Sequence, residues 1–169
     1  MQENTERRDR GRLTRGQRVG EFIGVIMMML LLAFFNHHLI VNSGFFTEKF
    51  GWQEMLLFYG PMLFATAAPI VRIVTGRRNV ARPVEAASNV FMALAAVRLL
   101  NVFPFDFTHM ADTLPESLRF ILSWVNNDIG RIGLTLQVVI CPVVAVFTMI
   151  TFASVRVRQA VTAPQRRYS

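Results

Sequence analysis

The chain has 169 residues, of which 53% are hydrophobic and 17% are charged, and its mean hydropathy is +0.38. A water-soluble domain of this size has too much surface for such a composition, so the composition indicates a membrane protein. The net charge is +7, and the single cysteine, Cys141, excludes an internal disulfide and a cysteine-cluster metal site.

Four apolar segments are long enough to cross a bilayer as helices. A spanning helix needs about 20 mostly apolar residues, because each residue adds about 1.5 Å and the hydrocarbon core is about 30 Å thick. Lipid offers no partner for an unpaired backbone group, so each segment is expected to be helical. The predicted spans cover residues 19–41, 52–75, 83–105 and 129–155. They predict an all-α integral membrane protein, a four-helix antiparallel bundle whose transmembrane domain covers residues 19–155.

The basic residues predict the orientation of this bundle. Arginines cluster in residues 1–18, between the second and third spans, and in the tail over residues 156–169, whereas Lys49, Arg119 and Arg131 fall on the opposite side. An excess of Lys and Arg marks cytoplasmic loops, so both termini are predicted to be cytoplasmic. Residues 1–18 and the tail from about residue 159 lack apolar periodicity and are expected to be disordered. The first span is expected to be retained, since no small-x-small cleavage site follows it.

The longest predicted loop, residues 106–128, lies on the outer side between spans three and four. Apolar residues recur in it at helical spacing, which predicts a short helix with Thr113 as its cap. This helix is expected to be interfacial, with Trp124 at the depth of the lipid headgroups. The alternative is a helix that packs over the outer mouth of the bundle. Asn127 or Asp128 is expected to cap the fourth span.

Arg98 lies inside the third predicted span, slightly outward of its centre. An arginine at this depth costs at least a few kcal/mol unless it has partners, so it is expected to face protein or water. Other polar residues predicted at similar depth or further outward are Asn101, Gln137, Asn36 and Glu54. One interpretation is a polar pocket that binds an anionic or quinone-like headgroup or a lipid phosphate. The other is a structural arginine that bridges helices through carbonyls and Gln137, or extends outward to Asp106.

The histidines offer a weaker hypothesis, a metal or haem site on the outer side. Its candidate ligands are His37, His38, His109, Asp106 and Asp112, since imidazole and carboxylate suit zinc or copper. However, adjacent helical residues point about 100° apart, and the sequence has no H-x-x-x-H or H-E-x-x-H spacing. No metal or other cofactor is therefore predicted.

The sequence carries no recognisable catalytic apparatus. It has no nucleophile–base pair, phosphate-binding loop or paired membrane carboxylates, so the protein is not expected to be an enzyme. We expect an accessory subunit, assembly factor or scaffold of a membrane complex. The alternatives are an oligomeric ligand-binding or transport unit around Arg98, and a metal or haem protein that uses the outer-side histidines.

The expected location is the inner (plasma) membrane of a bacterium, as a multi-pass protein. The use of arginine in place of lysine, with Lys49 as the one lysine, suggests a GC-rich bacterial genome. Expected partners are anionic lipid headgroups at the cytoplasmic face and other membrane subunits or a second copy of the chain. Nucleic acid is not expected, because no groove-reading helix or stacking platform is evident.

Overall fold

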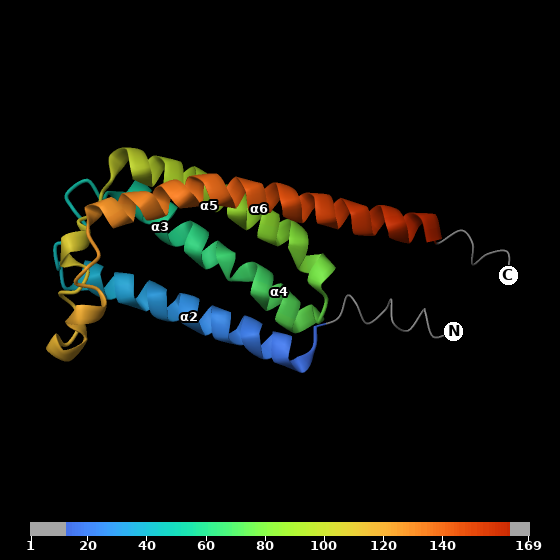
Figure 1. Cartoon of the computed structure of the whole chain (residues 1–169), viewed down its shortest axis with the longest axis horizontal. Coiled ribbons are helices and arrows are strands. Elements are labelled where there is room, and N and C mark those ends of the chain that lie inside the picture. The colour runs from blue at the N-terminus through green and yellow to red at the C-terminus, as the bar shows by residue number, and fades with distance from the viewer. Residues whose placement is uncertain (1–12, 163–169) are drawn as a thin grey trace.

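The computed structural model describes residues 13–162, with side chains through residue 157, and this part of the chain is helical without a named strand. Its elements are α2 (Arg15–Ile40), α3 (Trp52–Ala65), α4 (Ala67–Thr75), α5 (Arg78–Val102), the 3₁₀ helices η1 (Phe107–His109) and η2 (Glu116–Ile121), and α6 (Asn127–Thr162) (Figure 1). Four stretches are long and apolar enough to span a membrane: α2, α3 with α4, α5 and α6. The all-α class and the four candidate spans are thereby confirmed.

The helices form an open row rather than a closed bundle. α6 packs along α5, α3 and α4 pack against α5, and α2 packs mainly against α4. In the described part of the chain, α2 makes no close backbone contact with α5 or α6. Figure 1 shows α2 along one edge, α4 in the middle, and α5 with α6 along the other edge. A side of the molecule is therefore left open between its two outer helices.

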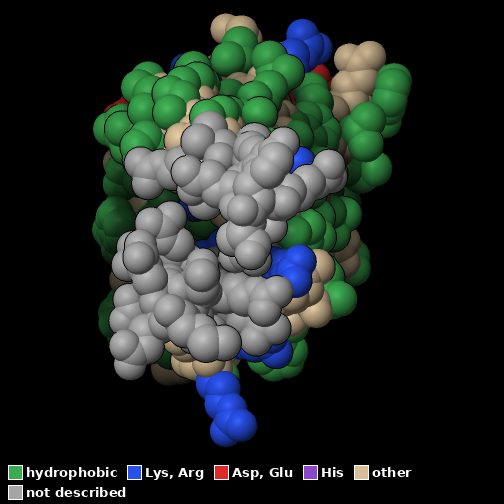
Figure 2. Space-filling view, turned by 90° about the vertical axis from the view of Figure 1, so that its right-hand side faces the viewer, with side chains coloured by type: hydrophobic (Ala, Val, Ile, Leu, Met, Phe, Trp, Pro, Cys, Tyr) green, Lys and Arg blue, Asp and Glu red, His purple; other side chains and the backbone are tan. Residues whose placement is uncertain are grey.

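The two ends of this row differ in character. One end, here called the basic end, holds the start of α2, the α4–α5 turn and the last turns of α6. The other, here called the loop end, holds the connection from α2 to α3 and the long connection from α5 to α6. Figure 2, which looks onto the basic end, shows Lys and Arg side chains at several places on this face and few acidic ones.

The second span is interrupted near its middle. The sequence predicted one segment over residues 52–75, but the helix is broken at Thr66, which ends α3 and precedes α4. Pro69 lies three residues further on and has no N–H to donate to the Ala65 carbonyl, so the regular bond pattern cannot continue there. The Thr66 hydroxyl instead donates to the Leu63 carbonyl at 2.6 Å.

Both ends of the described part, which covers residues 13–162, are helical beyond the predicted spans. Thr14 and Gln17 form a capping box, in which each side chain accepts a hydrogen bond from the other residue's backbone N–H, and α2 therefore begins at Arg15. The expected disorder was wrong for residues 13–18, and residues 1–12 lie outside the described part. α6 likewise continues to Thr162, through much of the predicted tail, and residues 163–169 lie outside the described part.

Both ends of α5 lie earlier in the chain than the ends of the predicted third span, residues 83–105. It starts at Arg78, because polar residues outside the hydrocarbon layer can still be helical, and it ends at Val102. Phe103 has a φ of 43°, and Pro104 follows it. A left-handed residue and a following proline are both typical of a helix end.

A core rich in aromatic residues lies at the loop end. Its buried members are Leu32, Phe35, Phe45, Met62, Leu99 and Phe105. The connection from α2 to α3 contributes Phe45, which is 1% exposed, and the Asp106 N–H donates to the Phe45 carbonyl at 2.7 Å. Gly130 on α6 lies against the Phe107 ring, where a Cβ atom would overlap that ring. The two long connections are thus fixed to each other and to the helices.

Candidate functional site

Arg98 pairs with Glu54, one of its predicted neighbours. Its Nη2 atom lies 3.2 Å from the Glu54 Oε1 atom, and the pair joins α5 to the first turn of α3. The Glu54 side chain is 8% exposed and that of Arg98 is 51% exposed. A buried carboxylate is stabilised by such a cation, so this contact supports the interpretation of Arg98 as a bridge between helices.

The other residues predicted around Arg98 are not drawn into one site with it. Gln137 on α6 donates through Nε2 to the Met92 carbonyl at 3.5 Å, while Asn36 and Asn101 are exposed. Neither of the two cavities described below is lined by Arg98. A ligand site at Arg98 stays a prediction.

The histidines have separate roles in the loop end. His38 is 1% exposed, with its Nδ1 atom 2.5 Å from the Ser43 hydroxyl and its Nε2 atom 2.8 Å from the Thr113 hydroxyl. Because both ring nitrogens are engaged, His38 ties α2 to both long connections. His37, its neighbour, is exposed.

His109 forms a local cluster with two carboxylates instead. Its Nδ1 atom lies 2.7 Å from Asp112, and its Nε2 atom lies 4.0 Å from Asp106. Within the described residues, no group of three His, Cys, Asp or Glu side chains is arranged to hold a metal ion. The structure therefore does not bring the five candidate ligands together, and the absence of a cofactor stays a prediction.

Two predicted helix caps are wrong. The Thr113 hydroxyl binds His38, and the short helix η2 is a 3₁₀ helix that follows Pro115 without a side-chain cap.

The Ile129 N–H at the start of α6 is capped by Asn126, whose Oδ1 atom accepts its hydrogen bond at 3.0 Å. The predicted cap Asn127 instead accepts a hydrogen bond from the Phe107 N–H at 2.7 Å. Thr113 and Asn127, which local sequence rules predict as caps, instead form hydrogen bonds with residues distant in the sequence.

Asp106 anchors the turn at η1. Its carboxylate accepts hydrogen bonds from the Thr108 hydroxyl at 2.6 Å, the Thr108 N–H at 3.1 Å and the Asn127 side chain at 3.3 Å. These bonds, above all that from the Thr108 hydroxyl, hold the pKa of Asp106 below its ordinary value of 3.8. The ionised form is therefore the one that stabilises this turn.

We expect a stability difference between wild type and Asp106→Ala that depends on pH. Because the folded pKa lies below the unfolded one, the stabilisation is complete above about pH 5 and is lost as the pH falls through the folded pKa. Thermal midpoints in detergent between pH 3 and 7 measure it. The exposed carboxylate variant Glu48→Gln serves as the control, and a difference that grows toward low pH would contradict the assignment.

A more elaborate polar site lies in the basic half of the molecule, at Arg72 of α4. Its guanidinium pairs with Glu21 of α2 through Nε at 2.8 Å and Nη2 at 3.0 Å, although the Nε–H is poorly aligned for a hydrogen bond. Its Nη1 atom donates to Glu85 of α5 at 2.9 Å. The Arg72 side chain is 17% exposed. One arginine therefore joins α4 to both α2 and α5, and it links α2 to α5, which make no close backbone contact in the described part of the chain.

This triad lines a lateral groove of about 610 Å³. α2 lines one wall, and the rest of the lining comes from α4, α5, the α3–α4 break at Ala65 and Thr66, and Cys141 of α6. Gly20 and Gly24 belong to the α2 wall, and a Cβ atom added to either would meet no atom within 4 Å. Ser88 and Asn89 add polar groups from α5. The groove thus combines small residues, which permit close approach, with polar side chains.

Sequence reasoning missed this groove, although signals for it were present. Gly16, Gly20 and Gly24 recur every four residues and so share one side of α2. Glu21 is an acid within an apolar helix, which is an uncommon feature of a span. The link from Glu21 to Arg72 could not be read from the sequence, because the two residues are 51 positions apart.

No family model, curated protein or solved structure matches this chain.

Proposed function

We propose that the protein is a noncatalytic accessory subunit of a membrane complex and that its lateral groove receives one face of a partner subunit's transmembrane helix. The observation that carries this proposal is the separation of α2 from α5 and α6, which leaves the groove of about 610 Å³ open on one side. An unfilled groove between membrane helices is normally occupied by lipid or protein, since helix packing there depends on close van der Waals contact.

The lining of the groove favours a helix as its occupant. Small residues let two helix backbones approach closely in a membrane, and Gly20, Gly24 and Ala68 supply them here. Ser88 and Asn89 offer hydrogen bonds across helices of the kind that add stability in lipid. The charged residues of the lining are two glutamates and two arginines, Arg72 and Arg78, so their formal charges balance and the fit to a partner depends on the small and polar side chains.

The proposal includes an orientation in the membrane. The basic end faces the cytoplasm of a bacterial inner membrane, as the placement of arginines favours. η2 and the segment after it then lie at the outer headgroup layer, where the exposed Phe120 and Trp124 are suited to the interface. The Trp124 indole N–H donates to the Ile121 carbonyl at 2.6 Å, which keeps this segment compact.

Bulky residues in the groove test the proposal. After extraction in mild detergent, the wild type is expected to retain a partner membrane protein at fixed stoichiometry. The variant Gly20→Leu with Gly24→Leu is expected to lose this partner, because the added side chains block close helix approach. The stoichiometry is measured by native mass spectrometry. The matched control is Gly133→Leu on α6, another glycine with open space around it and no part in the groove, and it is expected to retain the partner.

Three outcomes would contradict this function. One is a wild-type protein that stays monomeric after crosslinking in native membranes. Another is a partner retained equally by the groove variant. The third is association only with further copies of the chain, which would favour the oligomeric ligand-binding or transport unit instead. Unchanged helical circular dichroism of each variant shows that the fold is preserved.

A further inference from the structure

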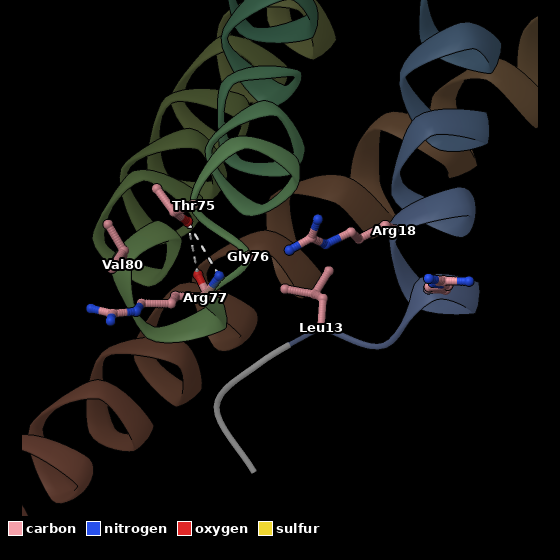
Figure 3. Close-up of a pocket in the computed structure, with 7 residues that line it drawn as sticks. Leu13, Arg18, Thr75, Gly76, Arg77 and Val80 are labelled. Atoms are coloured by element: carbon pink, nitrogen blue, oxygen red, sulfur yellow. Dashed lines mark hydrogen bonds between the residues drawn. The ribbon is translucent and has the colours of Figure 1, made fainter. Parts of the chain in front are cut away.

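A second cavity, of about 650 Å³, opens at the basic end between the start of α2 and the α4–α5 turn (Figure 3). Three of its seven lining residues are arginines, Arg15, Arg18 and Arg77, and none is acidic. The remaining lining residues are Leu13, Thr75, Gly76 and Val80. The cavity is therefore lined by basic, polar and apolar residues, with no acid among them.

The backbone fixes the shape of this cavity. The Leu13 N–H donates to the Gly76 carbonyl at 3.0 Å, which holds the chain before α2 against the α4–α5 turn. Gly76 has a φ of +65°, and a Cβ atom there would overlap the Arg18 guanidinium. Figure 3 shows Arg18 extending from α2 toward this turn, while Arg77 extends along the other side of the turn. A glycine at this position thus lets the Arg18 guanidinium lie beside the turn.

Two hydrogen bonds of the Thr75 hydroxyl stabilise the turn itself. The Thr75 hydroxyl donates to the Val71 carbonyl at 2.6 Å, and the Arg77 N–H donates to the Thr75 hydroxyl at 3.3 Å. α5 then begins without a side-chain cap and without an acid in its first turn. Unsatisfied N–H groups at a helix start favour a nearby anion, so the α5 terminus adds to the field of the arginines.

We propose that this cavity binds the phosphate group of an anionic phospholipid. Guanidinium groups bind phosphate oxygens through paired, charge-assisted hydrogen bonds, and basic pockets at the cytoplasmic ends of membrane helices suit lipid headgroups. The site goes beyond the partner role proposed above, because it lies outside the groove that would receive a helix.

Apolar surface beside the cavity favours a lipid over free phosphate. Val74, the neighbour of Thr75, is 78% exposed, and Val80 is 50% exposed. Ile70, one turn before Val74, is 44% exposed, so an exposed apolar face of α4 ends at the residue before Thr75, which lines the cavity. An acyl chain on this face would be continuous with a phosphate at the arginines, whereas inorganic phosphate would gain nothing from it.

The test is lipid binding by the full-length protein, measured by native mass spectrometry in detergent. The probes are phosphatidylglycerol, phosphatidylcholine and inorganic phosphate. The wild type is expected to bind one phosphatidylglycerol at least about tenfold more tightly than phosphatidylcholine. The variant Arg18→Gln with Arg77→Gln is expected to lose this preference. Arg156→Gln, which removes an arginine on α6 near the same end, is the charge control and is expected to keep it.

A further variant separates the cavity from general charge attraction. Val80→Trp keeps every arginine but fills the cavity, and it is expected to weaken phosphatidylglycerol binding at least about fivefold. The proposal is overturned if the arginine variant keeps the preference, if Arg156→Gln loses it equally, or if Val80→Trp binds as the wild type does. Inorganic phosphate that binds as tightly as the lipid would overturn the assignment to a phospholipid. Should the arginine variant not fold, Val80→Trp decides.

Discussion

Replacing Phe45 by alanine is expected to lower the free energy of unfolding by about 3–5 kcal/mol, the range for removing a large aromatic side chain from a packed core. Phe45 is 1% exposed, and its ring centroid lies between 4.8 and 5.6 Å from those of Phe35, His38, Phe46, Phe105 and Phe107. The variant leaves a cavity where both long connections meet α2, so the whole loop end is expected to loosen.

Thermal unfolding in detergent, followed by the fluorescence of the two tryptophans, measures this effect. The matched control is Phe120→Ala in η2, since Phe120 is 70% exposed and its loss is expected to change the stability by less than about 0.5 kcal/mol. A Phe45 variant as stable as the control would show that the aromatic core does not hold the loop end together.

The four spans were predictable because hydropathy over about 20 residues is a direct consequence of the bilayer as solvent. The sequence contained a signal for the break in the second span, but not enough to place the break. Pro69 signals it, but a proline in a membrane helix often produces only a kink, and hydropathy across residues 52–75 does not fall at Thr66. The order at residues 13–18 was also readable, because Thr14 and Gln17 have the spacing of a capping box.

The lateral arrangement of the helices was not predictable in the same way. Lipid tails are as apolar as leucine, so the apolar pattern of a span does not say which face meets another helix. Glu54, which the sequence placed further outward than Arg98, is the pocket candidate that contacts it. Depth along the membrane normal placed Gln137 and Asn36 near Arg98, but depth carries no information about which way a side chain points around its helix.

His38 shows the same limit at a single residue. His37 and His38 are adjacent at the end of a predicted span, so both were candidate metal ligands. Nothing in the sequence showed which of the two would be buried. The structure buries His38 between Ser43 and Thr113 and leaves His37 exposed. Thr113 is 75 positions away from His38, so the contact depends on how the long connection from α5 to α6 folds back.

Replacing Arg72 by leucine is the other change expected to have a large effect, on the order of 3 kcal/mol of stability. The reason is that Glu21 and Glu85 would remain in the groove without their cation, and an uncompensated charge in a low-dielectric site is far more costly than a missing pair. α2 is expected to separate first, because it packs chiefly against α4 and is joined to α5 through this arginine. Cysteine crosslinking between α2 and α5, together with the thermal midpoint, measures the separation.

The triple variant Arg72→Leu, Glu21→Gln, Glu85→Gln distinguishes charge from shape. If the triad matters through its charge balance, removing all three charges should restore most of the stability lost by Arg72→Leu, since a buried ion pair is often replaced by neutral groups at little cost. If stability is not restored, the geometry of the guanidinium, which contacts two helices at once, is what holds α2 in place. In that case the groove that α2 borders should close or widen in the triple variant, and association with a partner helix should fall along with stability.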